Sequence, residues 1–147
     1  MDVFLANEQD LPVEETRLAA LARHALDAEN IDEGAELSIL LVTTGHIKGL
    51  NRRFAGNDYA TDVLAFPMLE DDEGSLLLGD VVICPQIAGK NAAAGGRPLT
   101  DELDVLVVHG TLHLLGYDHQ GDKDKAKMEQ RLLEIVGSFS PAEAPDL

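Results

Sequence analysis

Apolar residues recur first at strand-like and then at helix-like spacing along the first part of the chain. Short apolar runs at 2–6 and 36–43 predict two strands, and the continuous Leu-Ile-Leu-Leu-Val stretch of the second predicts a strand covered on both faces. Between them we expect a helix over 12–28, with Pro12 in its first turn. Its apolar stripe consists of Leu18, Leu21, Ala22 and Ala25. His24 of this helix is expected to be solvated.

The rest of the pattern predicts one more helix, a strand pair and three further helices. Thr44 is expected to cap a short helix that Gly56 closes. Strands are predicted at 61–68 and 76–84. An acidic turn joins them, so we expect them to pair antiparallel, with Pro67 favouring an edge. The remaining helices are expected over 86–94, 101–115 and 122–136, with Asp122 as the cap of the last.

This order of elements predicts an α+β fold, in which a small mixed four-stranded sheet packs with about five helices. We expect one domain over residues 1–137. Residues 138–147 contain two prolines and no periodicity, and we expect them to form a mobile tail. A chain of 147 residues is long enough to bury about 68–70% of its unfolded surface as a single domain.

The helix predicted over 101–115 is the most apolar of the five and carries the candidate chemistry. Thr100 is expected as its N-cap, and two acidic residues put negative charge into its first turn. The residues that follow leave almost no polar face, so this helix should lie in the core. Into that apolar sequence fall His109 and His113, one turn apart and therefore on the same face.

Gly116 follows this helix and is the residue type that ends a helix in a left-handed conformation. A chain reversed there can bring His119 back toward the two helical imidazoles. Three neutral imidazoles spaced H-x3-H-x5-H suit a tetrahedral Zn²⁺ whose fourth position stays open for water or substrate. The alternative is that each histidine is a hydrogen-bonded core residue. Three such residues would each need a buried partner, or cost roughly 1–3 kcal/mol. The sequence therefore predicts one zinc ion held by His109, His113 and His119.

The same histidine spacing occurs in the metzincin zinc proteases, H-E-x-x-H-x-x-G-x-x-H. Those enzymes carry a glutamate after the first histidine, where this chain has Gly110. A peptidase that relies on this carboxylate as general base is therefore not expected. Asp118, beside His119, is a further candidate catalytic residue. It could act as a base or hold an imidazole in its metal-binding tautomer, and we favour the second role.

The segment HGTLHLLGYDH, together with Leu50–Asn51, TDVLAFP from Thr61 and LGDVVICP from Leu78, resembles the YbeY family of zinc-dependent endoribonucleases. The resemblance spans residues 38–136. It implies a single-strand-specific endoribonuclease that acts in rRNA maturation, at the 16S rRNA 3′ end, and in ribosome quality control. Whether water or the RNA 2′-hydroxyl attacks stays open. The implied partners are the small ribosomal subunit and an Era-type GTPase.

Two positions depart from the family pattern. Family members usually carry an arginine after the aromatic residue of the LNxxF/Y segment, where this chain has Ala55, and a serine where it has Ala65. Arg52 and Arg53 lie nearby and could supply the missing charge as contacts to substrate phosphates; the alternative is a solvated helix face. Ala55 and the strong acidity motivate a second hypothesis, a ribosome-associated assembly factor with a largely structural zinc and little nuclease activity. A zinc amidohydrolase or peptidase is a third.

The charge balance restricts the ways in which this protein could bind RNA. The formal net charge is −16, from 27 acidic and 11 basic residues, so global attraction to RNA is not expected. RNA binding would depend on the metal and on a local basic cluster, Lys48, Arg52 and Arg53. Cys84 is the only cysteine, so no intrachain disulfide is possible, and it is expected to pack in a strand. Without a signal-peptide pattern or a membrane-spanning apolar run, we expect a soluble cytoplasmic domain.

Overall fold

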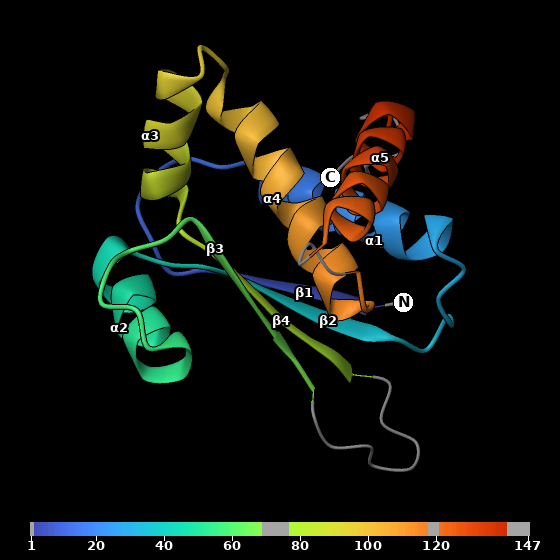
Figure 1. Cartoon of the computed structure of the whole chain (residues 1–147), viewed down its shortest axis with the longest axis horizontal. Helices are drawn as coiled ribbons and strands as arrows, with labels where there is room; N and C mark the ends of the chain where they lie inside the picture. The colour runs from blue at the N-terminus through green and yellow to red at the C-terminus, as the bar shows by residue number, and fades with distance from the viewer. Residues whose placement is uncertain (1, 69–76, 118–120, 141–147) are drawn as a thin grey trace.

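The computed structural model describes residues 2–68, 77–117 and 121–140. Within them it contains a four-stranded mixed sheet and five helices (Figure 1), which confirms the predicted α+β architecture. No helix in these ranges is long and apolar enough to cross a lipid bilayer. In chain order the elements are β1 (Asp2–Asn7), α1 (Glu15–Ala28), β2 (Glu36–Leu41), α2 (Thr44–Ala55), β3 (Val63–Pro67), β4 (Leu77–Ile83), α3 (Pro85–Ala94), α4 (Leu99–Leu114) and α5 (Asp122–Ser138).

The sheet has the strand order β1-β2-β4-β3. β1, β2 and β4 are parallel, while β3 runs antiparallel to β4 with Val63 opposite Ile83 and Pro67 opposite Gly79. This confirms the antiparallel pairing and the edge position that Pro67 favours, because a proline at an edge removes no hydrogen bond from the ladder. The outer side of β3 is not paired with another strand of the described sheet.

Two apolar cores lie on opposite faces of this sheet. The larger joins the sheet to α1, α4 and α5, and the smaller lies between the sheet and α2 (Figure 1). The smaller core consists of Val42, Ile47, Val82 and Cys84. Ile39 of β2 belongs to the larger core and Leu40 packs against the smaller one, so β2 is covered on both faces, as its apolar run predicts. Cys84 is fully buried, as expected of a packing residue.

The helix starts differ from the predicted ones by up to three residues. α1 begins at Glu15, so Pro12 lies before the helix and not in its first turn. The Oγ1 of Thr43, not of Thr44, accepts a hydrogen bond from the His46 N–H at 3.3 Å and caps α2. α4 begins at Leu99, before its predicted cap Thr100, and α5 begins at its predicted cap Asp122, so that both residues lie inside these helices. Thr43 and Thr44 are equally good capping residues, and the direction in which the chain leaves β2 decides between them.

The sequence predicts that α4 has almost no polar face, but the helix buries two carboxylates. Asp104 forms a two-bonded ion pair with Arg17 of α1, whose Nη2 donates to Asp104 Oδ2 at 2.7 Å. This hydrogen bonding raises the pKa of Arg17. Glu102 forms an ion pair with Arg97 just before the helix. Both acids are therefore compensated by cations, which burial requires.

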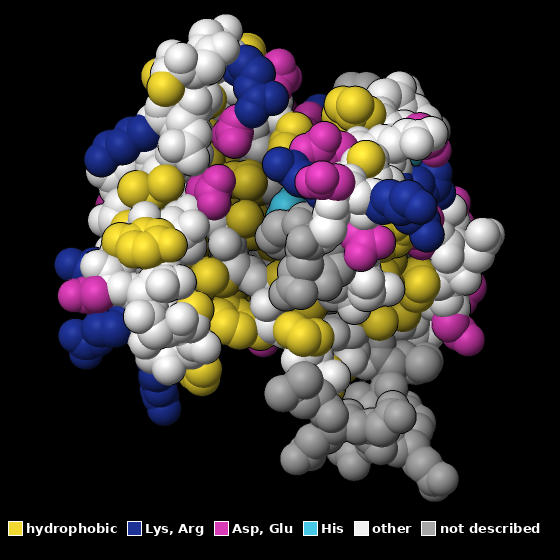
Figure 2. All heavy atoms as spheres, in the orientation of Figure 1, with side chains coloured by type: hydrophobic (Ala, Val, Ile, Leu, Met, Phe, Trp, Pro, Cys, Tyr) yellow, Lys and Arg dark blue, Asp and Glu magenta, His cyan; other side chains and the backbone are white. Residues whose placement is uncertain are grey.

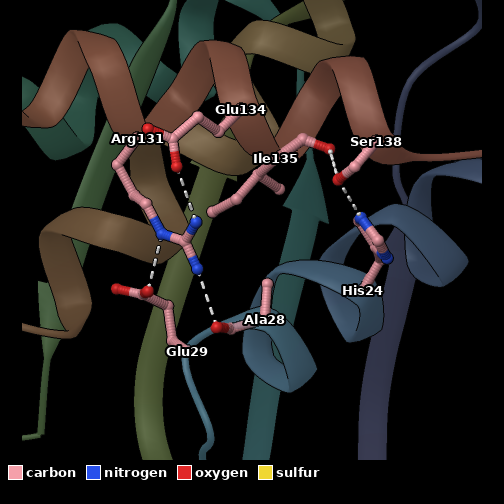
Figure 3. A network of polar contacts seen from close by, with 7 residues as sticks. All are labelled: His24, Ala28, Glu29, Arg131, Glu134, Ile135 and Ser138. Carbon is pink, nitrogen blue, oxygen red and sulfur yellow. Dashed lines mark hydrogen bonds and ion pairs between the residues drawn. The ribbon is translucent and has the colours of Figure 1, made fainter.

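The end of α5 packs against α1. The Oγ of Ser138 lies 2.9 Å from His24 Nε2 (Figure 3), and the rings of His24 and Phe139 are 5.5 Å apart between centroids. His24 is partly exposed, as expected of a solvated residue, but it also contacts Ser138 and Phe139, which the sequence did not predict. Of the segment expected to form a tail, Ser138 is the last residue of α5, and residues 141–147 lie outside the described part of the chain.

Candidate histidine site

His109 and His113 project from α4 into one cavity. The cavity has a volume of about 220 Å³ and is lined by Val63, Leu64, Ala65, His109, Gly110 and His113. Both histidines are partly buried, and the four-residue spacing places them on one face of the helix, toward β3. In Figure 2, histidine surface is visible in a recess at the middle of the face shown.

A second, smaller hollow adjoins the same helix on the side of α5. It has a volume of about 140 Å³ and is lined by His109, Lys125, Met128, Glu129 and Leu132. His109 therefore lies between β3 and α5 and contributes to both hollows. Met128 is buried in the core stripe of α5, in agreement with a packing role.

The turn after α4 has the geometry that its glycine predicts. Gly116 has a φ of +100°, in the region that glycine reaches at little cost, and its N–H donates to the His113 carbonyl oxygen at 3.1 Å. The next residue, Tyr117, packs against the larger core. A hydrogen bond to the Glu29 carboxylate, together with burial, raises the pKa of the Tyr117 hydroxyl. Tyr117 therefore ties the turn to the C-terminal end of α1.

The same carboxylate is held by α5 (Figure 3). Arg131 Nε donates to Glu29 Oε2 at 2.8 Å, and its Nη2 donates to the Ala28 carbonyl oxygen at 2.7 Å. Glu134 accepts a third bond from the same guanidinium at 3.0 Å. These contacts, the bond to Glu29 first, raise the pKa of Arg131. Sequence reasoning missed this network, because its partners are 102 residues apart and form no local pattern.

The remaining predicted site residues, Asp118 and His119, lie outside the described residues. Among residues 2–68, 77–117 and 121–140, no three side chains of metal-ligating type come close enough to hold an ion. What the described part offers is a pair of imidazoles at the wall of one cavity, and imidazole is a ligand type that Zn²⁺ uses. This donor pair fits two of the three ligands predicted from the sequence.

The close packing of α4 on β4 explains why residue 110 is a glycine. A Cβ at this position would lie 2.6 Å from Cγ1 and 3.1 Å from Cγ2 of Val81, a fully buried residue of β4. Any side chain here would require α4 or β4 to shift. The packing therefore disfavours a carboxylate at the position of the metzincin glutamate.

Arg52 and Arg53 are not part of the histidine cavity. Both are exposed in the last turn of α2, which packs on the sheet face opposite to α4 (Figure 1). Neither residue lines the cavity that contains His109 and His113. Ala55 is exposed at the same end of α2. Any contact of these residues with a substrate would therefore be made outside the cavity.

The fold and the site define a small α+β protein in which two histidines of one central helix line a cavity beside an antiparallel edge strand. The family model described as "Endoribonuclease YbeY" matches residues 4–140. The chain belongs to this family, which confirms the predicted resemblance.

Individual relatives cover nearly the whole chain. The protein named Endoribonuclease YbeY of Salinispora tropica is 44% identical over 95% of this chain and 96% of its own length. The protein of the same name from Thermobifida fusca is 44% identical over 95% and 94%. The solution structure of TM1509 from Thermotoga maritima matches with a TM-score of 0.62 and 28% identity, covering 99% of this chain and 96% of that one.

Proposed function

We propose that this protein is a zinc-dependent endoribonuclease that cleaves single-stranded RNA. Family membership and the names of its relatives support RNA as the substrate. The observation that carries the proposal is the pair His109 and His113 in one cavity next to the unpaired side of β3. The physiological substrate we propose is precursor rRNA, with 16S rRNA 3′ end processing and ribosome quality control as its context. The activity would then be cytoplasmic, with the small ribosomal subunit and an Era-type GTPase as partners.

In this proposal His109, His113 and His119 hold the zinc ion. When bound, Zn²⁺ supplies Lewis acidity at a phosphoryl oxygen and lowers the pKa of water. The partly buried position of the two described histidines limits access of bulk water and keeps their rings oriented by α4. Asp118 would accept a hydrogen bond from an imidazole N–H and so fix the tautomer whose other nitrogen faces the metal.

Strand β3 is the element along which the RNA would enter. Its side chains Val63 and Ala65 line the histidine cavity, and its outer edge is not paired within the described sheet. An extended single strand can lie along such an edge, next to the cavity of about 220 Å³. Arg52 and Arg53 would contact phosphates beyond the cavity.

The test is cleavage of a labelled single-stranded RNA by the zinc-loaded protein, compared with His113→Ala. We expect the variant to lose both cleavage and high-affinity zinc binding, measured separately by calorimetry. His46→Ala is a matched control, because His46 is an exposed histidine of α2 and lies outside the cavity. Undiminished cleavage by His113→Ala would refute the metal mechanism.

A second candidate function, a ribosome-associated assembly factor with a largely structural zinc, is favoured by two features of the sequence. The chain has Ala55 where family members usually carry arginine, and its net charge is −16. Ala55 is exposed, so Ala55→Arg should fold normally. If the natural protein binds ribosomal subunits without cleaving RNA and Ala55→Arg gains no cleavage, this second function is correct. A zinc amidohydrolase or peptidase is disfavoured, because Val81 fills the space that a carboxylate at Gly110 would need.

A further inference from the structure

Two exposed aromatic residues lie in the last turn of α2 and in the loop that follows it. The side chains of Phe54 and Tyr59 are 60% and 57% exposed, respectively. The whole chain contains four phenylalanines and two tyrosines. Aromatic side chains gain most from burial, so two exposed rings within six residues of sequence call for a functional explanation.

The Phe54 ring and the backbone of Tyr59 are held in place without a ligand. The Phe54 ring meets the Phe66 ring edge-on, with centroids 5.4 Å apart and planes at 67°, and Phe66 packs against the smaller core. Asn51, only 2% exposed, uses its Nδ2 to donate to the Tyr59 carbonyl oxygen at 3.0 Å. Its own carbonyl oxygen accepts from the Asn57 N–H at 3.2 Å. The loop after α2 is thus tied to the helix, and binding would cost little ordering of the loop.

The surroundings of the rings are positive although the protein is strongly acidic. The Arg53 guanidinium carbon lies 5.2 Å from the centroid of the Phe54 ring. From residue 44 to residue 60 the sequence contains Lys48, Arg52 and Arg53 but only one acid, Asp58, against a net charge of −16 for the chain. Figure 2 shows Lys and Arg side chains gathered at the edge of the molecule where Figure 1 draws α2. This local charge matches a polyanion.

Strand β3 connects these rings to the histidine cavity. Successive side chains of a strand point to opposite faces, so Ala65 lines the cavity while its neighbour Phe66 supports Phe54 on the other face. The outer edge of β3, unpaired in the described sheet, separates the two sites by the width of one strand. A flexible polymer that leaves the cavity around this edge would reach Phe54 within a few nucleotides.

We propose that Phe54, Tyr59 and Arg53 form a stacking platform for bases of single-stranded RNA next to the scissile nucleotide. The inference rests on the proposed nuclease function. Every base offers a π-face to a ring, so the platform would bind many sequences, and the arginine would add attraction to the phosphates. A guanidinium over an exposed ring, with further cations beside it, favours a nucleic acid over an apolar protein surface.

The chain contains no tryptophan, so Phe54→Trp introduces a single reporter at the platform. We expect a short oligouridylate to quench its fluorescence, because stacking of a base on the indole quenches emission. Phe4→Trp is the matched control, since Phe4 is 55% exposed on β1 at the opposite edge of the sheet. Its emission should not change. Equal responses of the two reporters, or no response at Phe54→Trp, would overturn the platform.

Affinity provides the second measurement, by anisotropy of the same labelled RNA with the full chain at fixed salt and with a chelator to prevent cleavage. Phe54→Leu should weaken binding about 5-fold or more, Phe54→Trp should retain it, and Phe4→Leu should leave it unchanged. If the natural protein binds and cleaves RNA but Phe54→Leu binds equally well, the platform is wrong while the nuclease function stands. If the natural protein neither binds nor cleaves single-stranded RNA, both proposals fail. If Phe54→Leu abolished binding of a partner protein but left the affinity for RNA unchanged, the platform would also be refuted.

Discussion

Replacing Gly110 by alanine measures how closely α4 packs on the sheet beside the histidines. The new Cβ would lie 2.6 Å from Val81 Cγ1, whereas carbon atoms in contact are about 3.5–4.0 Å apart, an overlap of roughly 1 Å. Val81 is fully buried and β-branched, which restricts the rotation of its side chain. The helix or β4 must therefore shift.

Two opposing terms set the expected change in the free energy of unfolding. Alanine in a helix is more favourable than glycine by about 0.5–1 kcal/mol, and overpacking of a buried site costs about 1–3 kcal/mol. The cost of overpacking should exceed the gain in helix propensity, so Gly110→Ala should lower the free energy of unfolding by about 1 kcal/mol. The matched control is Gly49→Ala in α2, where a Cβ meets no atom within 4 Å. That variant should gain about 0.5–1 kcal/mol, because only the propensity term remains.

Urea unfolding followed by far-ultraviolet circular dichroism, with a chelator present, gives both free energies. The difference between the two variants removes the helix-propensity term and isolates the packing term, about 1–3 kcal/mol. Val81→Ala should partly relieve the strain of Gly110→Ala, so the double variant should be more stable than the sum of the single changes predicts. If Gly110→Ala is stabilised as much as Gly49→Ala, or if the two changes at positions 110 and 81 are additive, the packing argument is refuted.

Three further predictions follow from the described contacts. Arg17→Met leaves the buried Asp104 carboxylate uncompensated and should cost about 3 kcal/mol in urea unfolding, and a loss below 1 kcal/mol would contradict the role of this pair. Gly79→Ala should fold poorly, since Gly79 has a φ of +141° and a Cβ there would overlap the Phe66 carbonyl oxygen; a normal yield and unfolding midpoint would disprove this. If the metal proposal is right, zinc at 100 times its dissociation constant should add about 2.7 kcal/mol to the stability of the natural protein. His109→Ala should not show this gain, and an equal shift in both proteins would count against the site.

Local regularity explains what could be predicted from the sequence. Strands and helices were recognised because apolar residues repeat with the period of the backbone that carries them, and the spacing of His109 and His113 fixed their common face. Pro67 indicated an edge strand, because a missing N–H excludes it from the middle of a sheet. The turn at Gly116 followed from the conformational freedom of glycine.

Contacts between distant segments were decided by the tertiary structure alone. No local pattern pairs Arg17 with Asp104, 87 residues away, or places α5 over His24. The sequence shows that Gly110 stands where the metzincins carry a glutamate. Only the packing of α4 on Val81 explains why a glycine is favoured there. Arg52 was a candidate contact to substrate phosphates or part of a solvated helix face, and only the packing of α2 places it on the sheet face opposite to α4. The physical reason is the same in each case: periodicity determines the face that a residue occupies on its own element, whereas its neighbours depend on how the elements pack together.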